Sequence, residues 1–183
     1  MTGAEASRLY KEGLEHLQAG RYSKAHENFL RVVKAFPKAV EPWYRRNGRH
    51  FSAAQRLERA LQLKPDEPQY IRALAETATR VGQSDYSAKL YRRLRQLEGD
   101  SLVSMLKHGR SLAQSGNLEA AERTFQEIVQ KYPNDTNVYR QWFRARKFKT
   151  IADPLLQDAV LRWQKCADDS PEKMSLGFAI AKA

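Results

Sequence analysis

The sequence predicts an all-α fold, a solenoid of repeated antiparallel helical hairpins. Glycine and proline are scarce, with 9 and 7 copies among 183 residues. Alanine, leucine, arginine, glutamate and glutamine are abundant, and these residues lose little side-chain freedom in a helix. The glycines that could end a helix recur at intervals of 28, 34 and 34 residues, at Gly20, Gly48, Gly82 and Gly116. An interval of this size is typical of stacked helical hairpins.

Three further markers keep the register of these glycines. A small residue stands five positions after each glycine, at Ala25, Ala53, Ser87 and Ala121. A large apolar residue stands nine positions after, at Phe29, Leu57, Tyr91 and Phe125. The seventeenth position holds Pro37, Pro65, Gly99 and Pro133.

Each marker has a structural reason. Glycine supplies the left-handed residue that closes the first helix of a hairpin. The small residue lets the second helix approach the first, and the large one fills the space between hairpins. Proline cannot continue the second helix, so the chain turns into the next unit.

This pattern, with Tyr22 after the first glycine and Trp43 near the start of a unit, resembles the tetratricopeptide repeat family. The best unit, 102–135, has Gly109, Gly116, Ala121, Phe125 and Pro133 in consensus places. The first unit matches at Gly13, Gly20, Tyr22, Ala25, Phe29 and Pro37. The resemblance covers about residues 4–148. It implies a right-handed superhelical solenoid whose first helices line a concave groove.

The predicted repeat array spans 1–148, and further helices occupy 149–183. The units are about 6–39, 40–67, 68–101, 102–135 and a partial 136–148. Gly48 follows Trp43 after only five residues. The first helix of the second unit is therefore expected to be short, Pro42–Asn47. A gap, a kink or a looped-out segment would each accommodate it.

The C-terminal part departs from the repeat. We expect a helix from Thr136 to Phe148 and another that starts at Pro154, with Asp153 as its cap, and ends near Ala167. A last helix, Pro171–Lys182, has an apolar side at Met174, Phe178 and Ile180. Residues 149–183 are therefore expected to form an incomplete repeat or a linker. The runs 153–156 and 175–183 together resemble the segment that joins the repeats to the enzyme in bacterial TPR–sulfotransferase fusion proteins, which would make the chain a recruiting arm.

Charge favours an anionic partner. There are 32 basic and 21 acidic residues, a net charge of +11, and such a surplus attracts acidic proteins, nucleic acids or membrane surfaces. Arg-rich helix faces in water would give the same count. No apolar run is long enough for a membrane span or a secretory signal. The one cysteine, Cys166, allows no internal disulfide and fits a cytoplasmic location.

No catalytic motif is recognisable, so the chain is not expected to be an enzyme or to hold a metal or cofactor. A phosphate-binding loop after a strand, which a sulfotransferase needs, is missing from the sequence. The four histidines have no metal-ligand spacing; they are His16, His26, His50 and His108.

The resemblance also implies where a partner would bind. In the family, ligands contact first-helix positions that packing leaves free. Transferred to this chain, these positions are Tyr10, Leu14, Tyr44, Arg72, Glu76, Arg80, Leu106, Arg110, Arg140, Arg144 and Lys147. The groove would be aromatic at its N-terminal end and basic at its C-terminal end. Tyr10 and Leu14 replace the Lys and Asn with which some family members clamp chaperone C-termini.

The leading hypothesis is a scaffold that binds an acidic peptide or protein in this partly basic groove, through Tyr10, Tyr44, Arg72, Arg110, Arg140, Arg144 and Lys147. Arginine suits carboxylates and phosphates. A nucleic-acid-binding repeat protein is the alternative, but it would carry the same base-reading residues in every repeat. A homodimer through the exposed side of the last helix is a third possibility.

Overall fold

The computed structural model describes residues 1–146, 148 and 150–183, and within 37–47 only the course of the backbone. All regular secondary structure in these residues is helical. The chain forms two compact units, Met1–Gly99 and Asp100–Ala183, each described here by itself. The helices are α1 Gly3–Gln18, α2 Tyr22–Ala35, α3 Pro37–Leu63, α4 Pro68–Arg80, α5 Ser84–Glu98, α6 Leu102–Gln114, α7 Leu118–Lys131, α8 Asn137–Ala145, α9 Pro154–Lys165 and α10 Pro171–Ile180.

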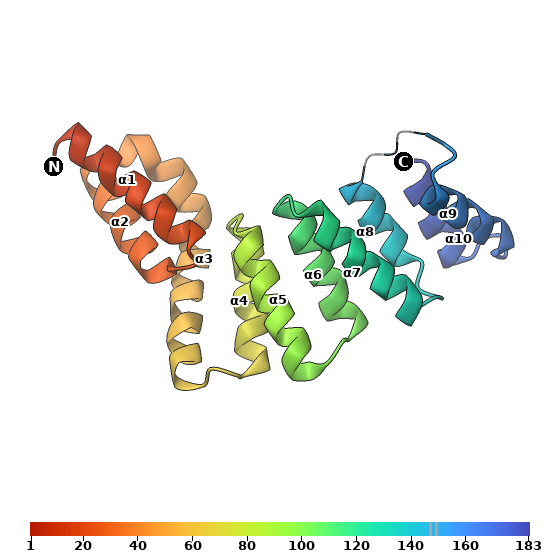
Figure 1. Ribbon diagram of the computed structural model, residues 1–183. Helices are drawn as coiled ribbons and strands as arrows, with labels where there is room; N and C mark the ends of the chain where they lie inside the picture. Colours follow the sequence, from red (N-terminus) through yellow and green to blue (C-terminus); the bar gives the residue numbers. More distant parts are fainter. Residues whose placement is uncertain (147, 149) are drawn as a thin grey trace. The chain divides into compact units, whose positions relative to one another are not determined.

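Three of the four predicted glycine turns are confirmed. Gly20, Gly82 and Gly116 have φ of +69°, +81° and +86° and follow the first helix of the hairpins α1–α2, α4–α5 and α6–α7. Figure 1 shows each pair side by side. Backbone of this kind favours glycine because a Cβ is strained there. The all-α fold of antiparallel hairpins is therefore confirmed.

A second glycine sets the distance between the helices of a hairpin. A Cβ added at Gly13 would lie 2.7 Å from Cε1 of Phe29, and one added at Gly109 would lie 2.9 Å from Cε1 of Phe125. Both rings are fully buried. Because the first helix has no side chain at this glycine, the large residue of the second helix can pack against its backbone.

The prediction that Gly48 ends a short helix, Pro42–Asn47, is wrong. Gly48 does not close a helix but lies inside α3, which continues to Leu63. Ala53, expected at the helix contact, is exposed, whereas Phe51 and Ala54 are fully buried. Glycine weakens a helix by only about 0.5–1 kcal/mol relative to alanine. Because α3 packs on both α2 and α4, burial of its apolar side outweighs that cost.

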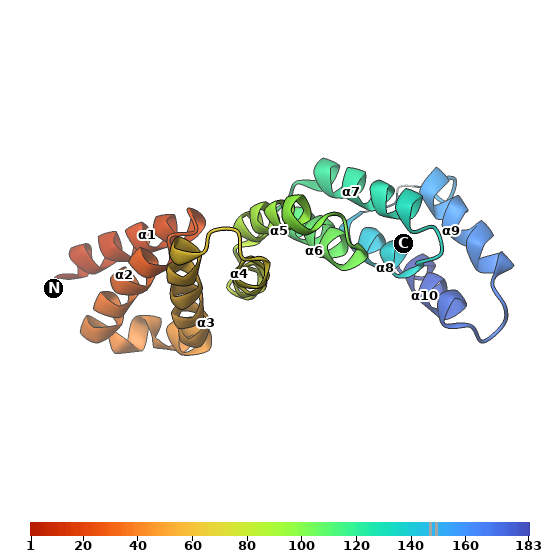
Figure 2. The ribbon, with the colours of Figure 1, turned by 90° about the horizontal axis from the view of Figure 1, so that it is seen from below.

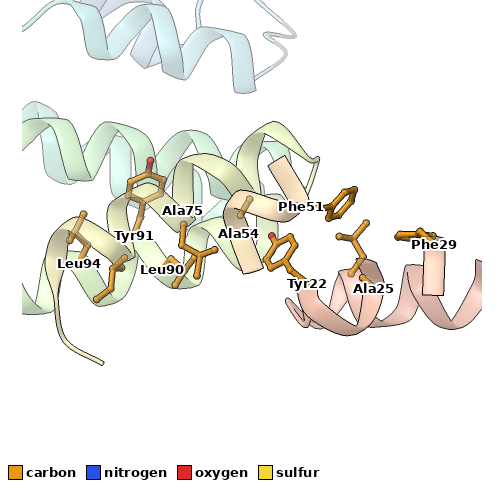
Figure 3. Packing of buried hydrophobic residues seen from close by; sticks show 13 residues of the cluster. Tyr22, Ala25, Phe29, Phe51, Ala54, Ala75, Leu90, Tyr91 and Leu94 are labelled. Carbon is orange, nitrogen blue, oxygen red and sulfur yellow. The ribbon is translucent and has the colours of Figure 1, made fainter. Parts of the chain in front are cut away.

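Three aromatic rings pack together in the core of the first unit. Figure 3 shows Phe51 of α3 near Ala25, with Tyr22 and Phe29 of α2 on its two sides. The ring centroid of Phe51 is 6.3 Å from that of Tyr22 and 6.0 Å from that of Phe29. Glu58 of α3 also holds the start of α2, since its carboxylate accepts a hydrogen bond from the Tyr22 amide at 3.1 Å. Burial raises the pKa of this carboxyl.

The second unit contains α6 to α10. In it α6, α7 and α8 contact one another, and α10 packs on α8 and α9, as Figure 2 shows from below. Asp153 caps α9 as predicted, accepting a hydrogen bond from the Leu155 amide at 3.0 Å. The helix expected to reach Phe148 ends at Ala145. The C-terminal helices therefore share one compact unit with the fourth repeat.

We predict that Gly109→Ala destabilises the second unit by about 1–3 kcal/mol, the range for overpacking a core. The added methyl meets a ring that is fully buried. Thermal unfolding followed by circular dichroism measures the effect. Gly3→Ala, with no atom within 4 Å of the added Cβ, is the control. Equal melting temperatures for the two variants would contradict the account, and Phe125→Leu should partly restore stability in the Gly109→Ala background.

We predict opposite effects for alanine at two marker glycines. Gly48→Ala should raise the free energy of unfolding by about 0.5–1 kcal/mol, because alanine is the better residue inside a helix. Gly116→Ala should lower it, because its φ is +86° and open space around it does not relieve that strain. Chemical denaturation compares both with the parent protein. Destabilisation by Gly48→Ala would indicate that a turn, and not a continuous helix, forms at that residue.

Candidate functional site

The hairpin α6–α7 provides one side of the candidate site. Ser101 begins α6, since its Oγ accepts a hydrogen bond from the Ser104 amide at 3.2 Å. Asn117 begins α7 in the same way, with its Oδ1 3.3 Å from the Ala120 amide nitrogen. Both are residue types favoured at a helix N-cap. The Gly109–Phe125 contact then fixes the two helices against each other.

Helix α8 provides the other side. One face of it is buried, with Val138, Tyr139, Trp142 and Phe143 at most 4% exposed. Trp142 stacks on Phe125 at a centroid distance of 6.0 Å. The hydroxyl of Tyr139 donates a 2.5 Å hydrogen bond to Asp158 of α9. With this face held, the opposite face of α8 presents Arg140 and Arg144 to solvent.

The candidate site is a pocket between α6 and α8, called here the α6–α8 pocket. Its volume is about 330 Å³. It is lined by Arg110, Ala113 and Gln114 of α6 and by Gln141, Arg144 and Ala145 of α8. Arg110 and Arg144 are exposed, and neither forms an ion pair within the described part of the chain. Two unpaired guanidinium groups thus share one cavity with two side-chain amides.

Charge is segregated between the helices around this pocket. Helices α6 and α8 contain four basic residues and no acidic one: Lys107, Arg110, Arg140 and Arg144. The acidic side chains of the adjoining helix α7 are Glu119, Glu122 and Glu127. The pocket is therefore formed by two helices that contain no acidic residue.

A second cavity, the α7–α8 pocket, lies between α7 and the C-terminal end of α8. It has a volume of about 420 Å³ and is lined by Leu118, Ala121, Glu122, Phe125, Trp142, Arg144, Ala145 and Arg146. Arg146 is engaged: its guanidinium lies 2.7 Å from Glu122 and 2.7 Å from Asp153. Arg144 lines both pockets.

The structure separates the predicted site residues into three groups. Arg110 and Arg144 come together in the α6–α8 pocket, and Arg140 is exposed one turn earlier on α8. Tyr10 and Arg72 belong to the other unit. Tyr10 packs on Phe29 at 5.6 Å between ring centroids. Arg72 is paired with Glu98 at 2.6 Å. The side chains of Tyr44 and Lys147 lie outside the described residues.

Sequence reasoning missed two groups of residues. Gln114 and Gln141 line the α6–α8 pocket beside the arginines. Gln114 is four positions after Arg110, and Gln141 is three before Arg144, so helical spacing could have identified both. The α7–α8 pocket was missed entirely, because its wall includes residues that the repeat pattern assigns to packing, such as Phe125 and Ala121.

Other features of the described residues bear on function. They contain no cluster of three potential metal ligands. None of their helices is long and apolar enough to cross a membrane. On α10, Met174 is 56% and Phe178 is 70% exposed, whereas Ile180 packs against the core of the unit. Self-association through this face stays a prediction.

Comparison with known proteins agrees with the hairpin geometry. Residues 10–46 and residues 103–135 each match a tetratricopeptide repeat family model. No curated protein matches the chain. Twelve chains of solved structures match. One, described as MamA MSR-1, is 18% identical with a TM-score of 0.50 over 97% of each chain. Another, MamA AMB-1, is 19% identical with a TM-score of 0.49 over 100% of this chain and 95% of that one.

At this level of identity the first likeness concerns the fold alone. The predicted resemblance of the C-terminal segment to sulfotransferase fusion proteins gains no support from these matches and stays a prediction. The repeat matches fall on the two hairpins, α1–α2 and α6–α7, in which glycine admits a buried phenylalanine. These two hairpins are therefore similar to tetratricopeptide repeats, and the chain has the helical-hairpin architecture of an interaction scaffold.

Proposed function

We propose that this chain is a protein-interaction scaffold that binds an acidic peptide segment of its partner in the α6–α8 pocket. The observation that carries the proposal is the pair Arg110 and Arg144. Their side chains line one cavity from two helices, and neither has an ionic partner among the described residues. An arginine that lines a cavity and has no ionic partner can form charge-assisted hydrogen bonds with a bound anion.

The chemistry of the pocket defines the ligand. Guanidinium groups donate pairs of parallel hydrogen bonds to carboxylates, and such charge-assisted bonds are stronger than neutral ones. The amides of Gln114 and Gln141 can both donate and accept, which suits the alternating groups of a peptide backbone. Aspartate and glutamate side chains, or a terminal carboxylate, would therefore match this site. Arg140, exposed on the same helix, adds positive charge beside it.

Nucleic acid fits the pocket less well. Binding of single-stranded RNA usually relies on aromatic side chains on which bases stack. The residues that line the α6–α8 pocket are arginine, alanine and glutamine, with no ring among them. The related positions in the first unit also differ, since Tyr10 packs in the core and Arg72 is neutralised by Glu98. This favours a peptide over a base-by-base reading of RNA.

We predict that Arg110→Glu combined with Arg144→Glu weakens binding of a fluorescein-labelled oligoglutamate peptide about tenfold or more. The loss of one charge-assisted hydrogen bond is worth about 1.5–3 kcal/mol, and about 1.4 kcal/mol corresponds to a factor of ten in affinity. Fluorescence anisotropy titrations at fixed ionic strength measure the dissociation constants. Circular dichroism verifies that the variant remains folded.

The control is Arg8→Glu combined with Arg123→Glu, which changes net charge equally at exposed side chains outside the pocket. Its affinity should stay within about twofold of the parent protein. If both double variants lose affinity to the same extent, binding follows overall charge and the pocket has no special role. Tighter binding to random single-stranded RNA than to the peptide, with a steep salt dependence, would favour the nucleic-acid alternative.

A further inference from the structure

We infer that the α7–α8 pocket receives an aromatic side chain, tyrosine or phenylalanine, from the same acidic peptide. That the ring belongs to the acidic peptide rests on the proposed function. The preference of the pocket for an aromatic ring rests on a separate observation. That observation is a comparison of two hairpins within this chain, one of which covers the corresponding residues with a ring of its own.

The hairpins α1–α2 and α6–α7 follow the same repeat register. Gly20 and Gly116 form equivalent turns with φ of +69° and +86°. Helices α2 and α7 are each 14 residues long and begin two residues after these glycines. Along them, Tyr22, Ala25 and Phe29 correspond to Leu118, Ala121 and Phe125. Three of the residues that line the α7–α8 pocket are thus the counterparts of core residues in the first unit.

In the first unit two rings cover these positions. Phe51 lies 6.0 Å from Phe29, and Tyr86 of α5 lies 5.8 Å from Tyr22, measured between centroids. Tyr86 also covers the turn, because a Cβ at Gly20 would lie 2.8 Å from its ring. As a result Tyr22, Ala25 and Phe29 are fully buried.

Among the described residues of the second unit, the ring of Phe51 has a counterpart, and no ring lies within 4 Å of a Cβ at the glycine turn as Tyr86 does in the first unit. Trp142 lies 6.0 Å from Phe125, as Phe51 does from Phe29. No atom lies within 4 Å of a Cβ built on Gly116, and Leu118 is 53% exposed where Tyr22 is fully buried. The α7–α8 pocket, about 420 Å³, is lined by Leu118, the counterpart of the Tyr22 that Tyr86 contacts in the first unit. Its size is within the range of pockets that bury small ligands.

The walls of the pocket suit an aromatic ring. Leu118 provides exposed aliphatic surface, and Ala121, Phe125 and Trp142 lie behind it, almost fully buried. The indole Nε1 of Trp142 is buried without an acceptor among the described residues. The guanidinium of Arg146, fixed by Glu122 and Asp153, closes one side. A cation near a ring adds a favourable interaction with its π face.

Arg144 links the two pockets, because it lines both of them. A peptide whose carboxylate binds Arg110 and Arg144 would have its neighbouring residues close to the α7–α8 pocket. The ligand we infer is therefore a short segment in which a tyrosine or phenylalanine lies near acidic residues. The acidic residues of the ligand are inferred from charge complementarity with the arginines. Its aromatic residue is inferred from the comparison with Tyr86 in the first unit.

The first test uses N-acetyltyrosinamide, a neutral molecule that does not depend on the basic pocket. In ¹H–¹⁵N spectra we expect it to shift the indole N–H of Trp142 and the amides of Leu118 and Ala121. Leu118→Trp, which places a ring of the chain at the mouth of the pocket, should abolish these shifts. Leu161→Trp is the matched control, since Leu161 is similarly exposed on α9 and lies outside the pocket; it should leave the shifts unchanged.

The second test compares two labelled oligoglutamate peptides, one with a central tyrosine and one with alanine in its place. We expect the tyrosine peptide to bind the parent protein about tenfold more tightly, as burial of one ring would give. Leu118→Trp should remove that difference and leave the affinity for the alanine peptide unchanged. Equal affinities of the parent protein for both peptides, or no shift at Trp142 with N-acetyltyrosinamide, would overturn the inference while leaving the acidic site intact. Arg110 lines the α6–α8 pocket and not the α7–α8 pocket, so a loss of binding of both peptides in the Arg110→Glu variant bears on the proposed function alone.

Discussion

The structure depends on a glycine that faces a phenylalanine inside a helical hairpin. At Gly13 and Gly109 the first helix has no side chain, so the ring of Phe29 or Phe125 lies against its backbone. Close packing of this kind leaves no room for even one extra methyl group. The second helix is thereby held at a fixed distance and rotation, which determines which residues face the neighbouring helix and which face solvent.

From this constraint follows the contrast between the two hairpins that share it. In the first unit, α3 and α5 supply Phe51 and Tyr86, and the outer side of the hairpin α1–α2 is closed by aromatic rings. In the second unit α8 supplies Trp142, and no ring of the described residues lies against the turn at Gly116 as Tyr86 does against the turn at Gly20. Leu118 is therefore exposed, although its counterpart Tyr22 is buried in the core of the first unit. Beside it, α8 presents arginines whose charges no described residue neutralises.

Much of the fold could be predicted from the sequence, because the residues that specify the turns act locally. A positive φ demands glycine, so the turns at Gly20, Gly82 and Gly116 could be identified without a structure. The resemblance to the repeat family then implied that Arg110 and Arg144 face the same side of consecutive first helices, and both line one pocket of the structure. Gly48 was wrongly expected to end a helix, because a glycine can lie inside a helix when packing on both sides stabilises that helix. Neighbours distant in the sequence could not be predicted. Glu98 pairs with Arg72 from another helix, and the open space above Leu118 reflects a ring that a distant helix does not supply.

The measurement that tests this account most directly is a crystal structure of the chain bound to an acidic peptide that contains one tyrosine. The account predicts carboxylates of the peptide on the guanidinium groups of Arg110 and Arg144, with the tyrosine ring against Leu118 in the α7–α8 pocket. A peptide bound elsewhere, on the arginines of α5 or on the exposed Met174 and Phe178 of α10, with both pockets of the second unit empty, would contradict it.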